Sequence, residues 1–297
     1  MRKLKNFIKK IIPGGFLNLR RNIRSIFVRI ETLERNQLSL LRERYGAESK
    51  SDLNSKEFKI YSQNGEDGVL LYIFSKIGIK NKKLVEIGIE EGKECNSANL
   101  VINFGWQGLL VEADLDEVLK ARHYYKHVKG IPEKRLKVAK SFVTTENVNK
   151  VIKDNGIEGE IDMLSIDIDG NDYWILEKID AVNPRMIVME YNASIPSGKS
   201  ITVPYDAEFD RFSKHESGLY HGASLRALTK LANQKGYILV GCESTGCNAF
   251  FVRKDLAKGK LKEISVDEAF YSQIYRIKHS SLEDQFDKIK DLKWTKI

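Results

Sequence analysis

The sequence predicts an α/β fold in which a seven-stranded, mostly parallel sheet is finished by an antiparallel hairpin. Three observations predict it. Short apolar runs alternate with helical stretches, these runs are apolar almost throughout, and the last two runs are joined by a short loop. The alternation is typical of βαβ units, and uniformly apolar strands are typical of parallel sheets covered on both faces.

Each element can be justified in turn. The predicted parallel strands are Lys83–Ile87, Gly108–Glu112, Leu136–Ala139, Met163–Asp167 and Met186–Glu190. Predicted helices at 95–104, 115–125, 146–155 and 172–180 connect them, and a fifth at 224–235 ends at Gly236. Tyr237–Gly241 and Ala249–Arg253 must pair antiparallel, because the loop between them is too short for a crossover. The fold is therefore Rossmann-like, and its terminal hairpin distinguishes it from dinucleotide-binding domains.

The chain divides into three predicted regions. Residues 1–55 form a basic extension and linker, residues 56–256 the α/β domain, and residues 257–297 a helical tail that packs on its outside. Residues 1–45 carry a net charge of +9, whereas the whole chain carries +8, so the body is close to neutral. Because nucleic-acid binding normally needs a basic face at the site, a nucleic-acid partner is disfavoured.

The extension is predicted to contain an amphipathic helix. Apolar residues and one glutamine recur three and four positions apart, which is a heptad-like seam. They are Phe16, Leu19, Ile23, Ile26, Ile30, Leu33, Gln37 and Leu40. The pattern fits a homo-oligomer formed through residues 16–41, a peripheral contact with an anionic membrane, or docking on the chain's own body. The seam alone does not decide among the three.

The N-terminal residues do not read as an export signal, because the apolar run Ile11-Ile12 is short and is broken by Pro13. Three cysteines form no disulfide framework and lack the spacing of a zinc site. We therefore expect a cytoplasmic protein, with peripheral contact at the inner membrane face if the extension binds lipid.

The first strand leads into a predicted cofactor site. Glu86, Gly88 and Gly92 form the pattern E-x-G-x-x-x-G at a strand–helix turn. Gly88 allows a ligand to approach the backbone closely, and Glu90 and Glu91 occupy the place where a pyrophosphate would lie. Acids there disfavour NAD and favour a cofactor that carries no phosphate.

Further cofactor contacts are predicted at neighbouring strand ends. Glu112 ends the second strand, where a carboxylate can accept both ribose hydroxyls, while Asp114 could equally cap the next helix. Ser141 and Phe142 follow the third strand, where an adenine ring would rest. Upstream, Gln63, with Glu66 and Asp67, could close over the cofactor or the acceptor.

Four motifs together carry a family resemblance. They are Tyr61–Leu70 (YSQNGEDGVL), Val85–Gly88 (VEIG), Leu164–Trp174 (LSIDIDGNDYW) and Asn248–Val252 (NAFFV). Residues 56–256 thereby resemble the FkbM-type class I methyltransferases, which use S-adenosylmethionine (SAM), and are most similar to a bacterial branch associated with surface-glycan synthesis. The resemblance implies transfer of a methyl group to an oxygen, commonly a sugar hydroxyl of a glycan or small acceptor.

Polar residues at two strand ends form the predicted reaction centre. Asp167 and Asp169 follow the fourth strand, and Glu190 and Asn192 follow the fifth. Gathered carboxylates need a proton, a partner or a metal. These four residues are therefore candidate ligands of Mg²⁺ or another divalent cation, an arrangement similar to that of metal-dependent sugar and catechol O-methyltransferases. Alternatively, Glu190 is a general base, and Asp167 binds the amino group of SAM.

Two further features complete the predicted site. His221 stands just before the fifth helix and is a candidate base, with His215 a weaker rival. Residues 193–221 form a long connection rich in aromatic and acidic residues, which predicts an acceptor lid, or else a segment that packs on the C-terminal helices. Two other functions stay open: methylation of nucleic acid with help from the basic extension, and a non-catalytic, cofactor-binding scaffold.

Overall fold

The computed structural model describes residues 53–297, and all structural statements concern that part of the chain. The predicted amphipathic helix at residues 16–41, with its three alternatives, lies outside the described residues. Within residues 53–297, no helix has the length and apolar character that crossing a bilayer requires.

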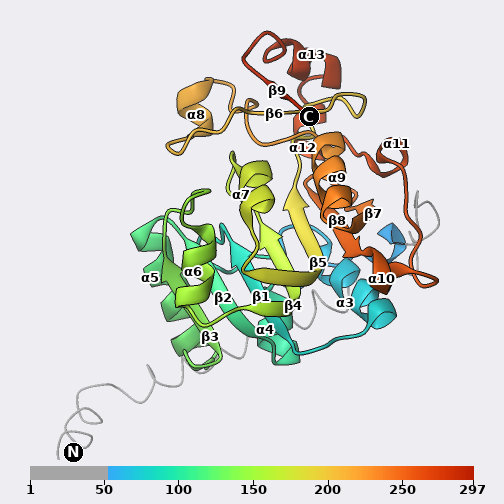
Figure 1. The fold of residues 1–297 in the computed structure, drawn as a ribbon. Helices are drawn as coiled ribbons and strands as arrows, with labels where there is room; N and C mark the ends of the chain where they lie inside the picture. Colours follow the sequence, from blue (N-terminus) through green and yellow to red (C-terminus); the bar gives the residue numbers. More distant parts are fainter. Residues whose placement is uncertain (1–52) are drawn as a thin grey trace, which may run out of the picture. The chain divides into compact units, whose positions relative to one another are not determined.

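A seven-stranded sheet forms the centre of the domain (Figure 1). Its order is β3-β2-β1-β4-β5-β8-β7, with all neighbours parallel except at β8. The strands are β1 (Lys83–Ile87), β2 (Gln107–Glu112), β3 (Leu136–Lys140), β4 (Gly159–Ile166), β5 (Val182–Glu190), β7 (Tyr237–Cys242) and β8 (Asn248–Arg253). The predicted Rossmann-like fold is confirmed, and its chain order reverses between β1 and β4, where ligands bind in such sheets.

Helices cover both faces of the sheet. One face packs against α3 (Glu66–Ile77), α4 (Ala98–Phe104), α5 (Leu115–His123) and α10 (Lys254–Ala257). The other packs against α6 (Val148–Asp154), α7 (Asp172–Lys178) and α9 (Leu225–Gln234). Neighbouring residues of one strand enter opposite clusters, as Leu109 and Leu110 of β2 do. Burial on both faces explains why these strands are apolar throughout.

The remaining elements are short. They are the 3₁₀ helix η1 (Asn54–Lys56), the π-helix η2 (Tyr124–Val128), β6 (Ile201–Thr202), α8 (Arg211–Lys214), α11 (Val266–Ala269), α12 (Ile274–Ile277), α13 (Leu282–Asp287) and β9 (Thr295–Lys296).

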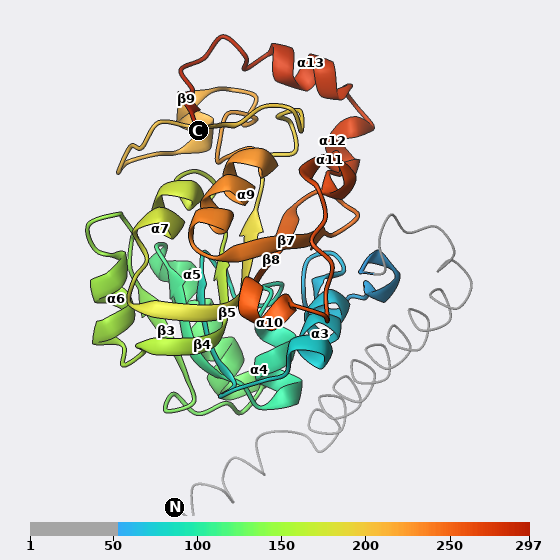
Figure 2. The same ribbon diagram turned by 45° about the vertical axis from the view of Figure 1, so that its right-hand side comes forward.

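The C-terminal region differs from the expectation of a purely helical tail on the outside. Its last strand, β9, pairs antiparallel with β6 from the long connection after β5. Both segments lie over the end of the sheet where β5 finishes (Figures 1 and 2). Tyr220 packs edge-to-face on Trp294, with ring centroids 4.7 Å apart, in a small cluster around the buried Ile289. The C-terminal segment therefore forms part of the domain at the carboxyl end of β5.

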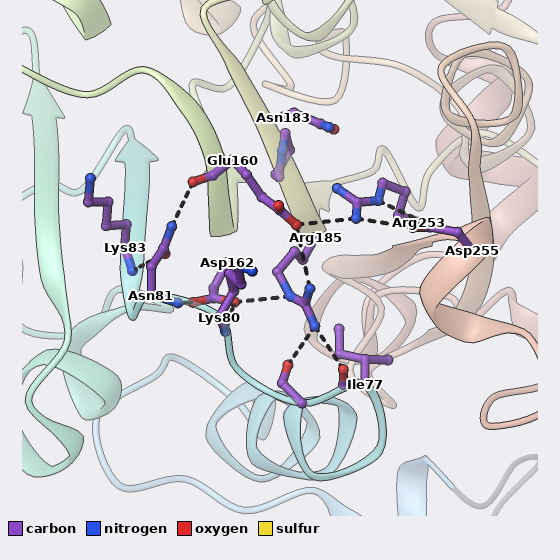
Figure 3. A network of polar contacts seen from close by, with 12 residues as sticks. Ile77, Lys80, Asn81, Lys83, Glu160, Asp162, Asn183, Arg185, Arg253 and Asp255 are labelled. Atoms are coloured by element: carbon purple, nitrogen blue, oxygen red, sulfur yellow. Dashed lines mark hydrogen bonds and ion pairs between the residues drawn. The ribbon is translucent and has the colours of Figure 1, made fainter.

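At the opposite end of the sheet, an ionic network ties the strands together (Figure 3). Asp162 of β4 is fully buried and accepts hydrogen bonds from the backbone N–H groups of Lys80, Asn81 and Lys82, at 2.6–2.8 Å. Its Oδ1 also lies 3.1 Å from Nε of Arg185 in β5. The network fixes the turn that enters β1 against the starts of β4 and β5.

Candidate active site

A cavity of about 560 Å³ opens at the carboxyl ends of β1, β2, β4 and β5. Most of the predicted site residues line it: Gln63, Glu86, Gly88, Gly92, Glu112, Ser141, Phe142, Asp167, Asp169 and Glu190. The volume is within the range of small-molecule sites. Strand order therefore brings together residues that are more than a hundred positions apart in the chain.

Gly88 permits a close approach of two backbones. Its φ is +81°, and a Cβ added there would lie 1.6 Å from the carbonyl oxygen of Asp167. The N–H of Gly88 donates to Val111, and that of Asp167 donates to Ile87. The sequence predicted a glycine that makes room for a ligand. The structure shows that it first makes room for the end of β4, which holds Asp167 beside the turn.

Glu86 and Gly92 shape the same turn from beneath. The buried carboxylate of Glu86 accepts hydrogen bonds from the backbone N–H groups of Asn96 and Ser97, at 2.8 and 2.9 Å. Burial raises its pKa. A Cβ at Gly92 would meet the Tyr125 ring at 3.0 Å, and the Gly92 carbonyl accepts the Tyr125 hydroxyl. Both residues line the cavity and also anchor its floor.

Glu112 lies at the rim and organises the glycine turn. Its carboxylate accepts backbone N–H bonds from Ile89 and Glu90 on one oxygen and from Ala113 and Asp114 on the other. It thus fixes the turn of β1 to the end of β2, and ribose hydroxyls would share these same oxygens. Asp114 takes the alternative role, because it caps α5 through the N–H groups of Asp116 and Glu117.

Phe142 presents an apolar surface to the cavity. Its side chain is 55% exposed, whereas the next residue, Val143, is buried. Such exposure is unusual for a phenylalanine. An aromatic ring that lines a cavity without packing into the core is suited to stack on adenine. The backbone of Ser141 beside it is held by an N–H bond to the Glu112 carbonyl.

We expect Phe142→Ala to weaken binding of S-adenosylhomocysteine (SAH) by about threefold to tenfold, the effect of one aromatic stacking pair. Because the ring is exposed, the thermal midpoint should change little. Calorimetric titration with SAH measures the effect. Leu119→Ala is the matched control, since Leu119 is 52% exposed on α5 and does not line the cavity. Equal effects of the two substitutions would contradict stacking.

Acidic side chains crowd the centre of the cavity. Burial raises the pKa of Asp167 well above its usual range, and the charges of Glu190 and Asp169 raise it further. Burial, with Asp169 and Asp172 nearby, raises the pKa of Glu190 to about 8. Because these shifts come from burial and from neighbouring negative charges, a cation bound beside the two carboxyls would stabilise their ionised forms.

Asp172 holds the loop that presents these acids. It accepts hydrogen bonds from the N–H groups of Ile168 and Gly170, at 2.8 and 3.0 Å. This turn places Asp169 at a φ of +56° and leaves its carboxylate exposed. Gly170 is required here because a Cβ would lie 2.4 Å from the Phe209 ring.

His221 lies behind Glu190 and does not line the cavity. Its Nδ1 is 3.8 Å from Oε2 of Glu190, and its Nε2 is 3.5 Å from Nη2 of Arg276. A guanidinium can only donate, so Nε2 accepts and the neutral ring carries its proton on Nδ1, toward Glu190. Burial and two arginines lower the pKa of His221 well below its usual range. His221 therefore lies beside Glu190 without a hydrogen bond to it, and its role as a base stays a prediction.

Two arginines that sequence reasoning missed enter the site. Arg211, at the start of α8, pairs with Asp169, and its Nε donates to the Gly218 carbonyl at 3.0 Å. Arg276 of α12 lines the cavity and donates to Ser194 at 3.2 Å. No local motif surrounds either residue. Only the packing of the long connection and the C-terminal segment brings them here.

Several predicted contacts are not made. Asn192, predicted as a metal ligand, is buried and does not line the cavity; its amide group donates to the carbonyls of Leu219 and His221, and its Oδ1 accepts from the N–H of Ser194. Glu66 and Asp67 are also buried and hold residues 60–64. His215 bonds Ser217 and lines a separate surface hollow.

The predicted lid both reaches the cavity and packs on the C-terminal segment. Phe209 and Arg211 line the cavity. Asn171 and Trp174 donate to the backbone carbonyls of Asp206 and Val203, at 2.7 and 2.8 Å, which fastens the connection over α7. Both predictions for residues 193–221, a lid over the site and packing on the C-terminal segment, thus describe part of the observed arrangement.

Charge divides the cavity into two sides. Its lining near the glycine turn is acidic, with Glu90, Glu91 and Glu112, which suits a cofactor bearing a sulfonium and an ammonium. The side formed by α8 and α12 contributes Arg211 and Arg276. A Rossmann-like sheet with this terminal hairpin and a phosphate-free, acidic cofactor side defines a class I SAM-dependent methyltransferase.

The family follows from comparison with known proteins. The family model described as the methyltransferase FkbM domain matches residues 55–239, more than half of the chain. The chain therefore belongs to the FkbM methyltransferase family, as its motifs predicted, and is a SAM-dependent enzyme. A comparison with curated protein sequences gives no significant match.

Solved structures of methyltransferases are similar only distantly. The chain is 14% identical to an O-methyltransferase from Bacillus cereus in complex with SAH, covering 73% of this chain and 87% of that one, with a TM-score of 0.40. It is 14% identical to a putative caffeoyl-CoA O-methyltransferase from Staphylococcus aureus, covering 62% and 81%, also with a TM-score of 0.40. The family assignment rests on the domain match.

Proposed function

We propose that the protein transfers the methyl group of SAM to a hydroxyl of a sugar or glycan precursor, with Glu190 as the general base. The observation that carries the proposal is the position of Glu190. It lines the cavity at the end of β5, its pKa is raised to about 8, and the nearest nitrogen of His221 lies 3.8 Å from its carboxylate. A base with a pKa near the working pH is the most effective at removing a hydroxyl proton.

The remaining steps follow from alignment and charge. In this proposal, the acids around Gly88 attract the cationic cofactor, and Asp167 pairs with its ammonium group. The sulfonium carbon is already electrophilic, so holding a hydroxyl in line with it supplies much of the acceleration. Asn248, Gln273 and the arginines at the other side offer hydrogen bonds to an oxygen-rich acceptor.

The test is a transfer assay with the full-length protein. Labelled SAM is incubated with a panel of sugars, sugar phosphates and nucleotide sugars, and the methylated product is identified by mass spectrometry. We expect an O-methylated sugar. Failure to bind SAH at high micromolar concentration would remove the proposal, and exclusive labelling of RNA or DNA would favour the nucleic-acid alternative.

Metal assistance is the second candidate. Asp169, Glu190 and His221 each offer one ligand atom, and these atoms lie within 4.8 Å of one another. However, Arg211 is already paired with Asp169, and Arg276 contacts His221. The guanidinium groups supply the positive charge that a divalent ion would bring, so the arrangement fits a metal-free reaction better.

We therefore expect EDTA to leave the transfer rate unchanged within about twofold. If a metal ion stabilised the transition state, its removal would instead cost several kcal/mol. The rate is measured after dialysis against EDTA, with and without added Mg²⁺. A loss of activity in EDTA that added Mg²⁺ reverses would overturn this expectation and would support the carboxylates as metal ligands.

A further inference from the structure

A second hollow adjoins the active-site cavity. It has a volume of about 510 Å³ and is formed by the end of the long connection together with α12, α13 and the turn between them. Gln273 and Arg276 line both spaces. A molecule that enters the active-site cavity past these two residues can therefore extend into this second hollow, which we call the outer groove.

The outer groove is basic. Its lining includes Arg276, Lys288 and His279, and none of the nine lining residues is an aspartate or glutamate. Among the described residues, no carboxylate lies within 4.0 Å of the Lys288 ammonium group. The active-site cavity carries the opposite balance, because acids dominate its lining. Two adjoining spaces of opposite charge indicate a ligand whose parts differ in charge.

Arg276 lies between the active-site cavity and the outer groove, and its hydrogen-bond partners are uncharged. Its hydrogen-bond partners are the Ser194 hydroxyl at 3.2 Å and His221 Nε2 at 3.5 Å. Within the described residues it forms no ion pair, in contrast to Arg211, which pairs with Asp169. The charges of Glu190 and Asp169 act on Arg276 from the active-site cavity, but neither carboxylate lies within ion-pair distance of it, so the guanidinium can still pair directly with an anionic group of a ligand.

Arg276 lies beyond residue 239, the end of the family match. The outer groove is therefore built by the C-terminal segment of this chain rather than by the matched domain alone. Such an addition beside a general active site is well placed to select the acceptor.

We propose that the outer groove binds an anionic group of the acceptor, a carboxylate or a phosphate, through Arg276 and Lys288. The acceptor hydroxyl then reaches Glu190 in the adjoining cavity. This inference rests on the proposed function and narrows its substrate class to an acidic or phosphorylated sugar. Arg276 and Lys288 are specificity residues, since they contact the end of the acceptor that does not react.

Calorimetry with the full-length protein saturated with SAH tests the proposal. Three probes of one ring type are titrated: glucose, glucuronate and glucose 1-phosphate. We expect at least one anionic probe to bind about tenfold tighter than glucose, since a hydrogen bond to a charged partner is worth about that factor or more. The preferred anion, carboxylate or phosphate, identifies the chemical source.

Matched variants locate the binding. Arg276→Gln should weaken the preferred anionic probe by about tenfold or more and should weaken glucose much less, because glucose loses only a hydrogen bond to a neutral group. Lys288→Gln, at an exposed position that tolerates substitution, should weaken it severalfold. Lys258→Gln, exposed beyond α10 and outside both spaces, is the control and should change nothing. Added salt should reduce the preference for the anionic probe.

The outcomes separate the two proposals. Binding of SAH without any preference for an anionic probe overturns the outer groove as an anion site and leaves the methyltransferase function in place. A preference that survives both Arg276→Gln and Lys288→Gln also overturns it. Absence of SAH binding removes the proposed function itself. If Arg276→Gln lowers the thermal midpoint, the Lys288→Gln result decides.

Discussion

Replacing Glu190 by glutamine is expected to slow methyl transfer by about 10²- to 10⁴-fold, the usual contribution of a general base. Glutamine keeps the size of the side chain and its contact with His221 but cannot take a proton. Because Glu190 is not among the residues that form the glycine turn, affinity for SAH should stay within a few-fold. Single-turnover rates with saturating SAM measure the first effect, and calorimetry measures the second.

The matched control is Glu208→Gln, an exposed acid of the same long connection that does not line the cavity. It should retain full activity. If Glu190→Gln lost less than about threefold, far below the contribution of a base, Glu190 would not be the group that accepts the proton. A scaffold without chemistry predicts the same indifference, so this experiment also tests that alternative.

The pH profile gives an independent check. Since the pKa of Glu190 is raised to about 8, the carboxyl is mostly protonated, and inactive as a base, below that pH. The value of kcat/KM should therefore rise with pH through about 8 and level off above it. In Glu190→Gln this rising limb should disappear, and its persistence would assign it to another group.

The sheet could be predicted from the sequence because local and tertiary preferences agree there. Strands such as Lys83–Ile87 are apolar throughout, and both of their faces are buried in the structure. In contrast, α3 was missed, since residues 66–77 begin with buried acids that the sequence presented as candidate site residues. The β6–β9 pair was missed because two-residue strands carry no periodic pattern.

Residues that line the cavity on the glycine-turn side could be predicted, because Gly88, Glu112 and Asp167 stand at or just after the ends of predicted strands. The arginines on the opposite side of the cavity could not be predicted. Arg211 and Arg276 reach the cavity from irregular segments, and their positions depend on packing such as that of Tyr220 against Trp294. His221 was placed in the correct neighbourhood, but its sequence position could not show that it stands behind Glu190.

Replacing Asp162 by alanine is expected to lower the free energy of unfolding by about 3–5 kcal/mol, the usual cost of breaking a buried ion pair from one side. The substitution removes the carboxylate that lies 3.1 Å from Arg185, which keeps only a longer contact with the half-buried Glu160 at 3.5 Å. It also removes the acceptor of three backbone N–H groups at residues 80–82. Urea unfolding followed by circular dichroism measures the loss.

Asp255→Ala is the matched control, because Asp255 pairs with Arg253 at 2.7 Å in the same network but is 61% exposed (Figure 3). An exposed pair contributes about 1 kcal/mol or less. Equal losses for the two substitutions would show that burial of Asp162 does not govern the network. Asp162 lies toward one end of β4, and Asp167 follows the other end. Asp162→Ala should therefore lower stability, while the protein that stays folded should still bind SAH. Stability and chemistry would then be separable along a single strand.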